Sequence, residues 1–414
     1  MINSHIIFKR NWLIFLIRQI IITFICLLIM PDYLSAVEVQ KKTNALVIGQ
    51  AINIKSKILN EERPIWVYLP EDYKTSGNKK YPVIYMLDGA YHFHHITGSI
   101  QILAKRNRIP QMIVIAIPYI DYDRRDRDLS PTSENGRPPV ADADKFLAFI
   151  EEELIPFTDR NYRTNPYRIL FGHSRAGLFS IYTLIENPEL FNTYLSISPS
   201  LYWDNRLMFK KMESFSIKKS NIKRKLFLSV ADGDYDQIRL SVIDFAELLE
   251  KKRPEGLEVQ YSYLKNEDHG SIVHRAFYNN IEDLFINWRL ISEQIESMSF
   301  NQLKEYYRNL SNKFGYKMQV PSWASLQIAR QLTAAGKKEE ALEILEFILE
   351  QNPNESEAYF LIGYFHDIAG ELELAREKLE TGLSLIDESD IKYRTYRNIH
   401  DQLLKRINEA TPLE

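Results

Sequence analysis

The sequence predicts an α/β fold, a mostly parallel β-sheet with helices on both faces, followed by a small all-α domain. Between about residues 50 and 290, short apolar segments rich in β-branched residues alternate with amphipathic segments of helical period. After about residue 295 the pattern is helical throughout, and similar residues recur 34 positions apart. These observations place a sheet-based domain before a helical one.

Length and composition restrict the classes of protein that need to be considered. The chain has 414 residues, of which 45% are hydrophobic and 12% aromatic, so a mainly disordered chain is excluded. The formal net charge of −3 gives no indication of a polyanionic partner, and we expect no nucleic acid binding. Cys26 is the single cysteine, which excludes disulfides within the chain and metal clusters built from cysteine.

The N-terminal segment has the layout of an export signal. Lys9 and Arg10 precede the apolar stretch Ile20–Met30. We therefore expect residues 1–36 to be a signal peptide and the protein to be periplasmic or secreted. An N-terminal membrane anchor that stays uncut is the competing interpretation, because Arg18 interrupts the hydrophobic segment.

Seven strands and three clear helices are expected in the first domain. Several of the strands are apolar without interruption, which is typical of strands buried on both faces. The expected strands are Ile65–Leu69, Val83–Leu87, Met112–Ile117, Arg168–Phe171, Tyr194–Ser198, Leu226–Val230 and Val259–Leu264, and the helices are Asp144–Phe157, Ala176–Glu186 and Val242–Lys251.

A long polar segment interrupts this alternation. Tyr119–Asp142 is charged, contains prolines and has neither a helical nor a strand period. Because a loop of this length inside a compact domain is usually functional, we expect it to shape a substrate pocket.

The helical region contains an internal repeat. A period of 34 residues with small residues at the helix crossings is typical of tetratricopeptide helix pairs. The sequence therefore predicts a sheet-based domain over residues 37–295, a linker helix over 296–320, and tetratricopeptide-like repeats over 321–414 that could bind a protein partner. The recurring pairs are Gly336 and Gly370, Ala341 and Ala375, and Leu345 and Leu379.

Ser174 is the candidate nucleophile. Residues 168–177 (RILFGHSRAG) read as a strand, a sharp turn and the start of a helix. Such a turn is a nucleophile elbow, because the tight bend exposes the hydroxyl and the helix N-terminus favours negative charge nearby. Small residues flank it, Gly172 and Ala176, where the common pattern has glycine at both places. The alternative is an ordinary strand-to-helix turn with a capping serine.

A nucleophilic serine needs a base and an acid, and in this kind of fold both follow it along the chain. His269 comes directly after the last expected strand and is the candidate base. The acid should follow the strand before that one, where Asp232, Asp234 and Asp236 are the candidates. A surface histidine in a polar loop is the alternative for His269.

Two backbone N–H groups could form an oxyanion hole, and a group of histidines could suggest a metal site. One backbone N–H should come from Arg175, and the other from Gly89 or Ala90, in the loop after the strand Val83–Leu87. Three histidines could bind a metal, but alternation along a loop does not bring their rings together. We therefore favour packing or pocket lining for them, and expect no metal and no cofactor. These histidines are His92, His94 and His95.

Six stretches across about residues 50–290 resemble the putative esterase (esterase D-like) family of α/β-hydrolases, which includes ferric enterobactin and ferri-bacillibactin esterases. The resemblance implies an α/β-hydrolase fold with Ser174 as nucleophile, His269 as base and Asp234 as the best-matched acid. Its members act on small-molecule esters, and some are acyltransferases. The stretches are MLDGAYHF, RDRDLSPT, ADKFLAFIEEELIPF, YRILFGHSRAGLFS, SISPSLYWDN and NEDHGSIVHRAFYNNI.

The sequence therefore leaves three hypotheses about the function. The leading hypothesis is an exported serine esterase that hydrolyses carboxylic esters, including esters of the siderophore type. The second hypothesis keeps the same residues but passes the acyl group to an alcohol. In the third, the repeats form a protein-interaction module on an inactive hydrolase scaffold. A complete set of serine, histidine and aspartate argues against the third.

Overall fold

A computed structural model describes residues 45, 47–133, 141–218, 222–288 and 290–410. The chain divides into two units, Met1–Val47 and Ile48–Glu414, and the description below concerns the second. The expected signal peptide or anchor, residues 1–36, lies outside the described residues. In the part of the chain that is described, no helix combines the length and the apolar character needed to cross a membrane.

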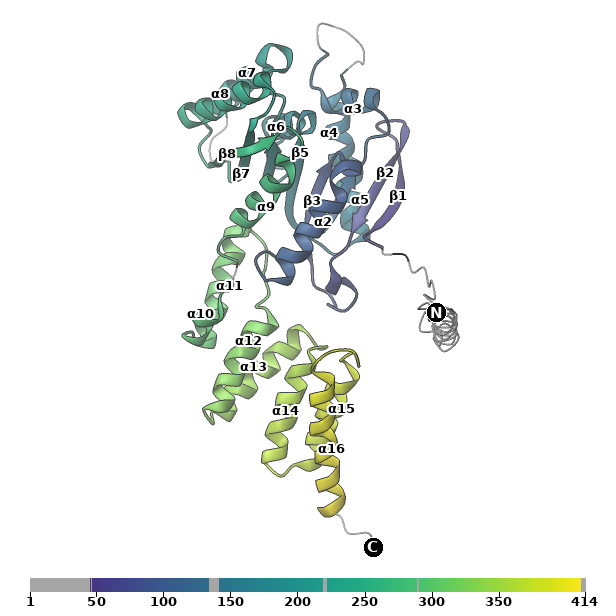
Figure 1. Cartoon of the computed structure of the whole chain (residues 1–414), viewed down its shortest axis with the longest axis vertical. Helices are drawn as coiled ribbons and strands as arrows, with labels where there is room; N and C mark the ends of the chain where they lie inside the picture. Colours follow the sequence, from purple (N-terminus) through teal and green to yellow (C-terminus); the bar gives the residue numbers. More distant parts are fainter. Residues whose placement is uncertain (1–44, 46, 134–140, 219–221, 289, 411–414) are drawn as a thin grey trace, which may run out of the picture. The chain divides into compact units, whose positions relative to one another are not determined.

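A mixed β-sheet forms the centre of the structure (Figure 1). Within the described residues it has eight strands in the order β1-β2-β4-β3-β5-β6-β7-β8. Strands β1, β2 and β4 pair antiparallel, and all neighbours from β4 to β8 pair parallel, which confirms the expected fold class. The strands are β1 Gln50–Ser56, β2 Glu61–Tyr68, β3 Tyr81–Leu87, β4 Ile113–Ile117, β5 Thr164–His173, β6 Thr193–Ile197, β7 Arg224–Gly233 and β8 Leu257–Asp268.

Helices cover both faces of the sheet (Figure 1). The side chains of β3 alternate between two hydrophobic clusters: Ile84 and Met86 enter one, and Val83, Tyr85 and Leu87 enter the other. A strand buried on both faces therefore reads as one uninterrupted apolar run. The first cluster includes helices α2 Gly89–Lys105 and α9 Ile272–Leu284; the second includes α4 Ala143–Ala148, α5 Ile155–Asn161, α6 Arg175–Glu186, α7 Trp203–Lys218 and α8 Asp236–Lys252.

Two elements differ from the expectation. Strand β1 was not expected, because it is a largely exposed edge strand with few apolar residues. The segment Tyr119–Asp142 was expected to be a loop, but it contains helix α3, Tyr122–Leu129. The N-cap Asp121 accepts a hydrogen bond from the N–H of Arg124, as is usual at a helix start. Because α3 is mostly polar, it has no apolar period to reveal it.

The rest of the chain is helical, as expected. Helix α11 lies inside the segment expected to be a linker, and its Tyr307 and Phe314 are buried in the same hydrophobic cluster as α2 and α9. Gly336 and Gly370 both have positive φ after a helix, which explains why glycine recurs there at the repeat period. The tetratricopeptide assignment and the domain boundaries stay predictions. The helices are α10 Ser292–Glu296, α11 Phe300–Phe314, α12 Ser322–Ala334, α13 Lys338–Gln351, α14 Ser356–Ile368, α15 Leu372–Ser384 and α16 Tyr393–Ala410.

Candidate active site

Ser174 lies at a sharp turn between β5 and α6. Its backbone has φ 59° and ψ −117°, a conformation that is strained for any residue except glycine. A Cβ atom on Gly172 would lie 2.1 Å from the backbone oxygen of Ala176, so only glycine fits there. The methyl group of Ala176, at the place where the common pattern has glycine, is fully buried. The sequence thus folds into the elbow that its motif indicates.

His269 connects Ser174 to Asp234 through two hydrogen bonds. Its Nε2 lies 3.0 Å from the hydroxyl oxygen of Ser174, and its Nδ1 lies 2.8 Å from Oδ1 of Asp234. The side chain of Asp234 is fully buried, whereas that of His269 is 21% exposed. With Nδ1–H donating to the carboxylate, Nε2 is left to accept the proton of the serine hydroxyl.

The other two candidate acids have different partners. The carboxylate of Asp232 accepts hydrogen bonds from the backbone N–H groups of Asn266 and Glu267, and so ties the end of β7 to β8. Asp236 lies at the exposed start of α8 and pairs with Arg239. The structure therefore brings only Asp234 of these three aspartates to the histidine.

The two candidate oxyanion donors lie at neighbouring helix N-termini. Arg175 is the first residue of α6, and Gly89 and Ala90 are the first two of α2. Strands β5 and β3, which lead into these helices, are parallel neighbours in the sheet. Because N–H groups at a helix N-terminus favour negative charge, this edge of the sheet is suited to an oxyanion. Gly89 has no room for a side chain, since a Cβ there would lie 2.9 Å from that of Ala116.

Two aromatic rings flank His269, and neither was identified as a functional residue from the sequence. His173 packs on it with ring centroids 4.6 Å apart, and Tyr235 lies 5.1 Å away. Burial lowers the pKa of His173 well below its usual value, and His269 and His92 lower this pKa further. His173 is therefore neutral, so it holds the ring of His269 without competing for its proton. The two rings were missed because the sequence positions of His173 and Tyr235 do not predict which way their side chains point.

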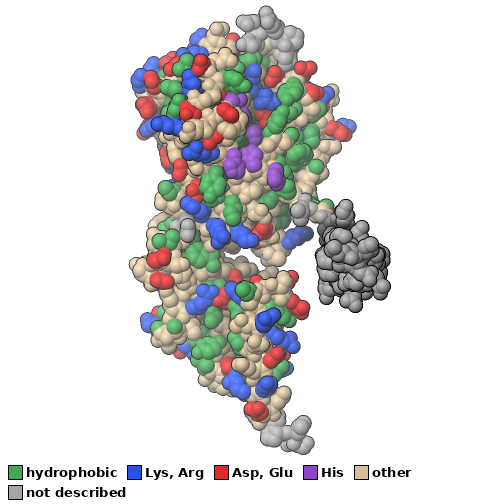
Figure 2. All heavy atoms as spheres, in the orientation of Figure 1, with side chains coloured by type: hydrophobic (Ala, Val, Ile, Leu, Met, Phe, Trp, Pro, Cys, Tyr) green, Lys and Arg blue, Asp and Glu red, His purple; other side chains and the backbone are tan. Residues whose placement is uncertain are grey.

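Histidine side chains lie close together on the visible face of the molecule (Figure 2). Nδ1 of His92 lies 3.1 Å from Nε2 of His95, and Nδ1 of His95 lies 3.3 Å from Nδ1 of His274. Burial is the main factor that lowers the pKa of His92 and that of His95, each to about 4. Among the described residues, no group of three histidine, cysteine or acidic side chains has an arrangement that could hold a metal ion.

The fold and the site together define the class. A mostly parallel sheet that carries an elbow serine after β5, an aspartate after β7 and a histidine after β8 is the α/β-hydrolase arrangement. Within this class the chain belongs to the putative esterase family, because the sequence model of that family matches residues 56–267, about half of the chain.

Known proteins similar to this chain include siderophore esterases. The ferri-bacillibactin esterase BesA of Bacillus subtilis is 29% identical over 256 residues, which cover 56% of this chain and 88% of BesA. The siderophore enterobactin esterase of Emericella nidulans is 29% identical over 263 residues, which cover 51% of this chain and 86% of that enzyme. Among solved structures, an IroE-like serine hydrolase from Shewanella oneidensis has a TM-score of 0.62 and 28% identity, over 72% of this chain and 97% of the hydrolase.

Proposed function

We propose that this protein is a serine esterase whose catalytic residues are Ser174, His269 and Asp234. The observation that carries the proposal is the hydrogen-bonded chain from Asp234 through His269 to Ser174, in which the serine lies at a strained elbow. A strained backbone costs free energy that a purely structural turn has no reason to store, so this conformation supports a functional role.

The geometry supports an acyl-enzyme mechanism. The Ser174 oxygen attacks the ester carbonyl carbon while Nε2 of His269 takes the hydroxyl proton. The N–H groups of Ala90 and Arg175 stabilise the negative oxygen of the tetrahedral intermediate. His269 then gives the proton to the leaving alcohol, and the acyl group stays on Ser174. A water molecule, deprotonated by His269, attacks this acyl group and releases the carboxylic acid.

The proposed substrate is a small-molecule ester of the siderophore type. Two relatives named for siderophore esters match this chain over more than four-fifths of their own length. We further propose that the protein is exported. N-terminal sequencing of the protein from its own host would then start near Val37, whereas a start at Met1 in the membrane fraction would indicate the anchor instead.

Hydrolysis assays on two kinds of ester test the proposal. We expect purified protein to cleave both a p-nitrophenyl acetate and a ferric catecholate trilactone, with the products followed by chromatography. Ser174→Ala should lose at least about a thousandfold in kcat. Ser384→Ala, which removes an exposed hydroxyl from α15, is the matched control. Cleavage of the acetate alone would reject the siderophore class, and Ser174-independent cleavage of both would reject the mechanism.

A further inference from the structure

Helix α3 contacts both strand β2 and the turn that precedes the candidate oxyanion donors Gly89 and Ala90. Its Arg125 donates two hydrogen bonds to one carboxylate: Nε to Oδ1 of Asp88 at 2.7 Å and Nη2 to Oδ2 at 2.6 Å. Asp88 is 4% exposed and directly precedes Gly89 and Ala90. Such a two-point pair fixes both the position and the orientation of the carboxylate.

The turn that Asp88 forms needs an external support. Asp88 is the N-cap residue of α2, yet its side chain makes no capping hydrogen bond to that helix. Its backbone is left-handed, with φ 53°, which is unfavourable for a residue with a side chain. The contact that fixes its side chain is therefore the one with Arg125, and this turn sets the direction of the Ala90 N–H.

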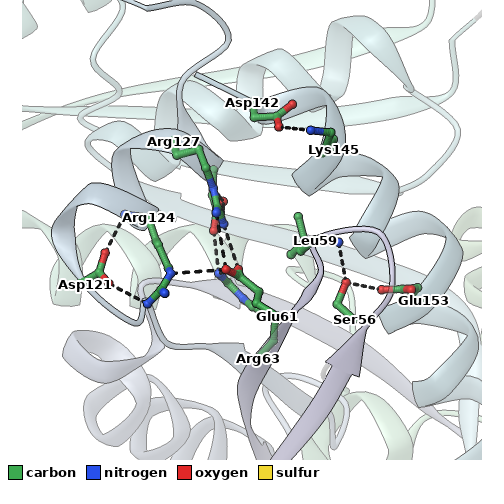
Figure 3. A network of polar contacts seen from close by, with 11 residues as sticks. Ser56, Leu59, Glu61, Arg63, Asp121, Arg124, Arg127, Asp142, Lys145 and Glu153 are labelled. Carbon is green, nitrogen blue, oxygen red and sulfur yellow. Dashed lines mark hydrogen bonds and ion pairs between the residues drawn. The ribbon is translucent and has the colours of Figure 1, made fainter. Parts of the chain in front are cut away.

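Ion pairs with β2 hold α3 in place (Figure 3). The side chain of Arg63 is 2% exposed and lies 2.8 Å from the carboxylate of Asp128. Glu61, on the same strand, pairs with both Arg124 and Arg127 of α3. Buried Asp128 and half-buried Arg127 thus fix the helix to the sheet, whereas the exposed pair of Arg124 adds little. Arg125 reaches from the helix to the candidate site.

The end of α3 contacts the second oxyanion residue as well. Ser130, the C-cap residue of α3, accepts a hydrogen bond from the guanidinium of Arg175 at 3.3 Å. That guanidinium also lies 3.5 Å from the ring centroid of Trp203. One anchored segment therefore contacts both turns that carry the candidate oxyanion donors.

We propose that Arg125 is a positioning residue for catalysis, which holds the Asp88 turn so that the Ala90 N–H points at the developing oxyanion. This inference rests on the proposed esterase function. Since the oxyanion exists only after the serine has attacked, loss of Arg125 lowers kcat and leaves KM for a small ester unchanged. Removal of a whole oxyanion donor costs about a hundredfold to a thousandfold in kcat, so its misplacement should cost about tenfold or more.

Three single variants test the role in steady-state hydrolysis of p-nitrophenyl acetate. Arg125→Gln should lower kcat about tenfold or more with KM within about twofold. Arg125→Lys keeps the charge but loses the two-point geometry, so it should recover part of kcat. The control Arg124→Gln removes a neighbouring arginine that faces Glu61 and Asp121, and should stay within about twofold of the original enzyme.

A double-mutant cycle with Asp88→Asn shows through which residue Arg125 acts. If Arg125 works through the Asp88 turn, the double variant loses no more activity than the worse single variant. Multiplied losses in the double variant would overturn the proposal. So would a raised KM with unchanged kcat in Arg125→Gln, because Arg125 would then bind substrate directly.

A binding measurement separates this inference from the proposed function. A boronic acid that forms a tetrahedral adduct on Ser174 should bind Arg125→Gln about tenfold more weakly, and Arg124→Gln normally. Equal binding to Arg125→Gln and to the original protein would overturn the inference while the esterase proposal stands. If the original protein neither hydrolyses esters nor binds the boronic acid, the esterase proposal itself fails.

Discussion

Ser174 has a backbone conformation that glycine adopts without strain, with φ 59° and ψ −117°. We therefore expect Ser174→Gly to be more stable than Ser174→Ala by about 1 kcal/mol, although both variants are inactive. Thermal unfolding of the two variants measures this difference. At Ser216, inside helix α7, the same pair of substitutions should give the opposite order, since glycine costs about 1 kcal/mol relative to alanine in a helix. Equal stability of the two Ser174 variants would show that the elbow is not strained.

The three aspartates after β7 should have separable roles. Asp234→Asn should lower kcat by about a thousandfold or more, because the amide no longer fixes the tautomer of His269 or stabilises its charged form. Asp232→Asn weakens the tie to β8 and should mainly lower stability. Asp236→Asn removes an exposed ion pair and should change little. A larger kinetic loss in Asp232→Asn than in Asp234→Asn would contradict this assignment.

The buried histidines near the site should make the protein less stable in acid. The pKa of His92 is about 4 in the folded protein against 6.5 ordinarily, so the unfolded chain binds more protons between these values. Stability therefore falls as the pH is lowered from about 6.5 to 4, by about 3 kcal/mol from His92 alone. His92→Phe should flatten the dependence of urea unfolding on pH, and exposed His94→Phe should leave it unchanged. An unaltered slope in His92→Phe would mean that folding does not lower the pKa of His92.

At the scale of single elements, α3 depends on the buried pair Arg63–Asp128. Arg63→Met leaves a buried carboxylate without its main partner and should destabilise the protein by about 3 kcal/mol. The double variant Arg63→Met/Asp128→Leu removes both charges and should recover most of this loss. Denaturant unfolding of the two variants checks the prediction. A double variant that is less stable than Arg63→Met would show that Asp128 stabilises the fold without Arg63, through its second partner Arg127.

The sequence predicted the elements whose side chains enter the core. The interior strands were found because residues such as those of β3 are apolar at every position. Strand β1 and helix α3 could not be found, because an edge strand and a polar helix bury too few apolar side chains to produce a periodic hydrophobic pattern. Helix α3 is instead held by ion pairs with β2. The sequence alone does not show which charged residues, far apart along the chain, will pair with one another.

The same limit applied to the candidate site. Ser174 and His269 could be predicted because each follows a recognisable strand directly. The choice among Asp232, Asp234 and Asp236 could not be derived from spacing, since all three lie within five residues of one another and a turn can point any of them at the histidine. The contact between Arg125 and Asp88 was missed for a similar reason, because nothing in either segment indicates the other.

At the scale of the whole described unit, helix α11 completes the hydrophobic cluster that α2 and α9 form on one face of the sheet. The ring of Phe314 lies 5.4 Å from that of Tyr167 on β5 and 5.0 Å from that of Phe285. A chain that ends at Gln319 keeps these contacts, and we expect it to fold and to cleave small esters. A chain that ends at Ser299 loses them, and because each large buried aromatic side chain contributes about 2–3 kcal/mol, it should be insoluble or unfold at much lower temperature.

Solubility, circular dichroism and thermal unfolding of the two truncated chains decide this point. An unfolded chain 37–319 would show that α12 and α13 also belong to the minimal hydrolase. A stable chain 37–299 would show that α11 is dispensable. Either result would relocate the end of the hydrolase domain.

Covalent labelling of Ser174 tests the central claim most directly. A fluorophosphonate should react with the protein, and trypsin should then release the labelled peptide Ile169–Arg175, in which Ser174 is the single hydroxyl residue. We predict that mass spectrometry finds the label on this peptide in the original protein, and that His269→Ala reacts far more slowly. A protein that hydrolyses esters while this peptide stays unlabelled would contradict the account.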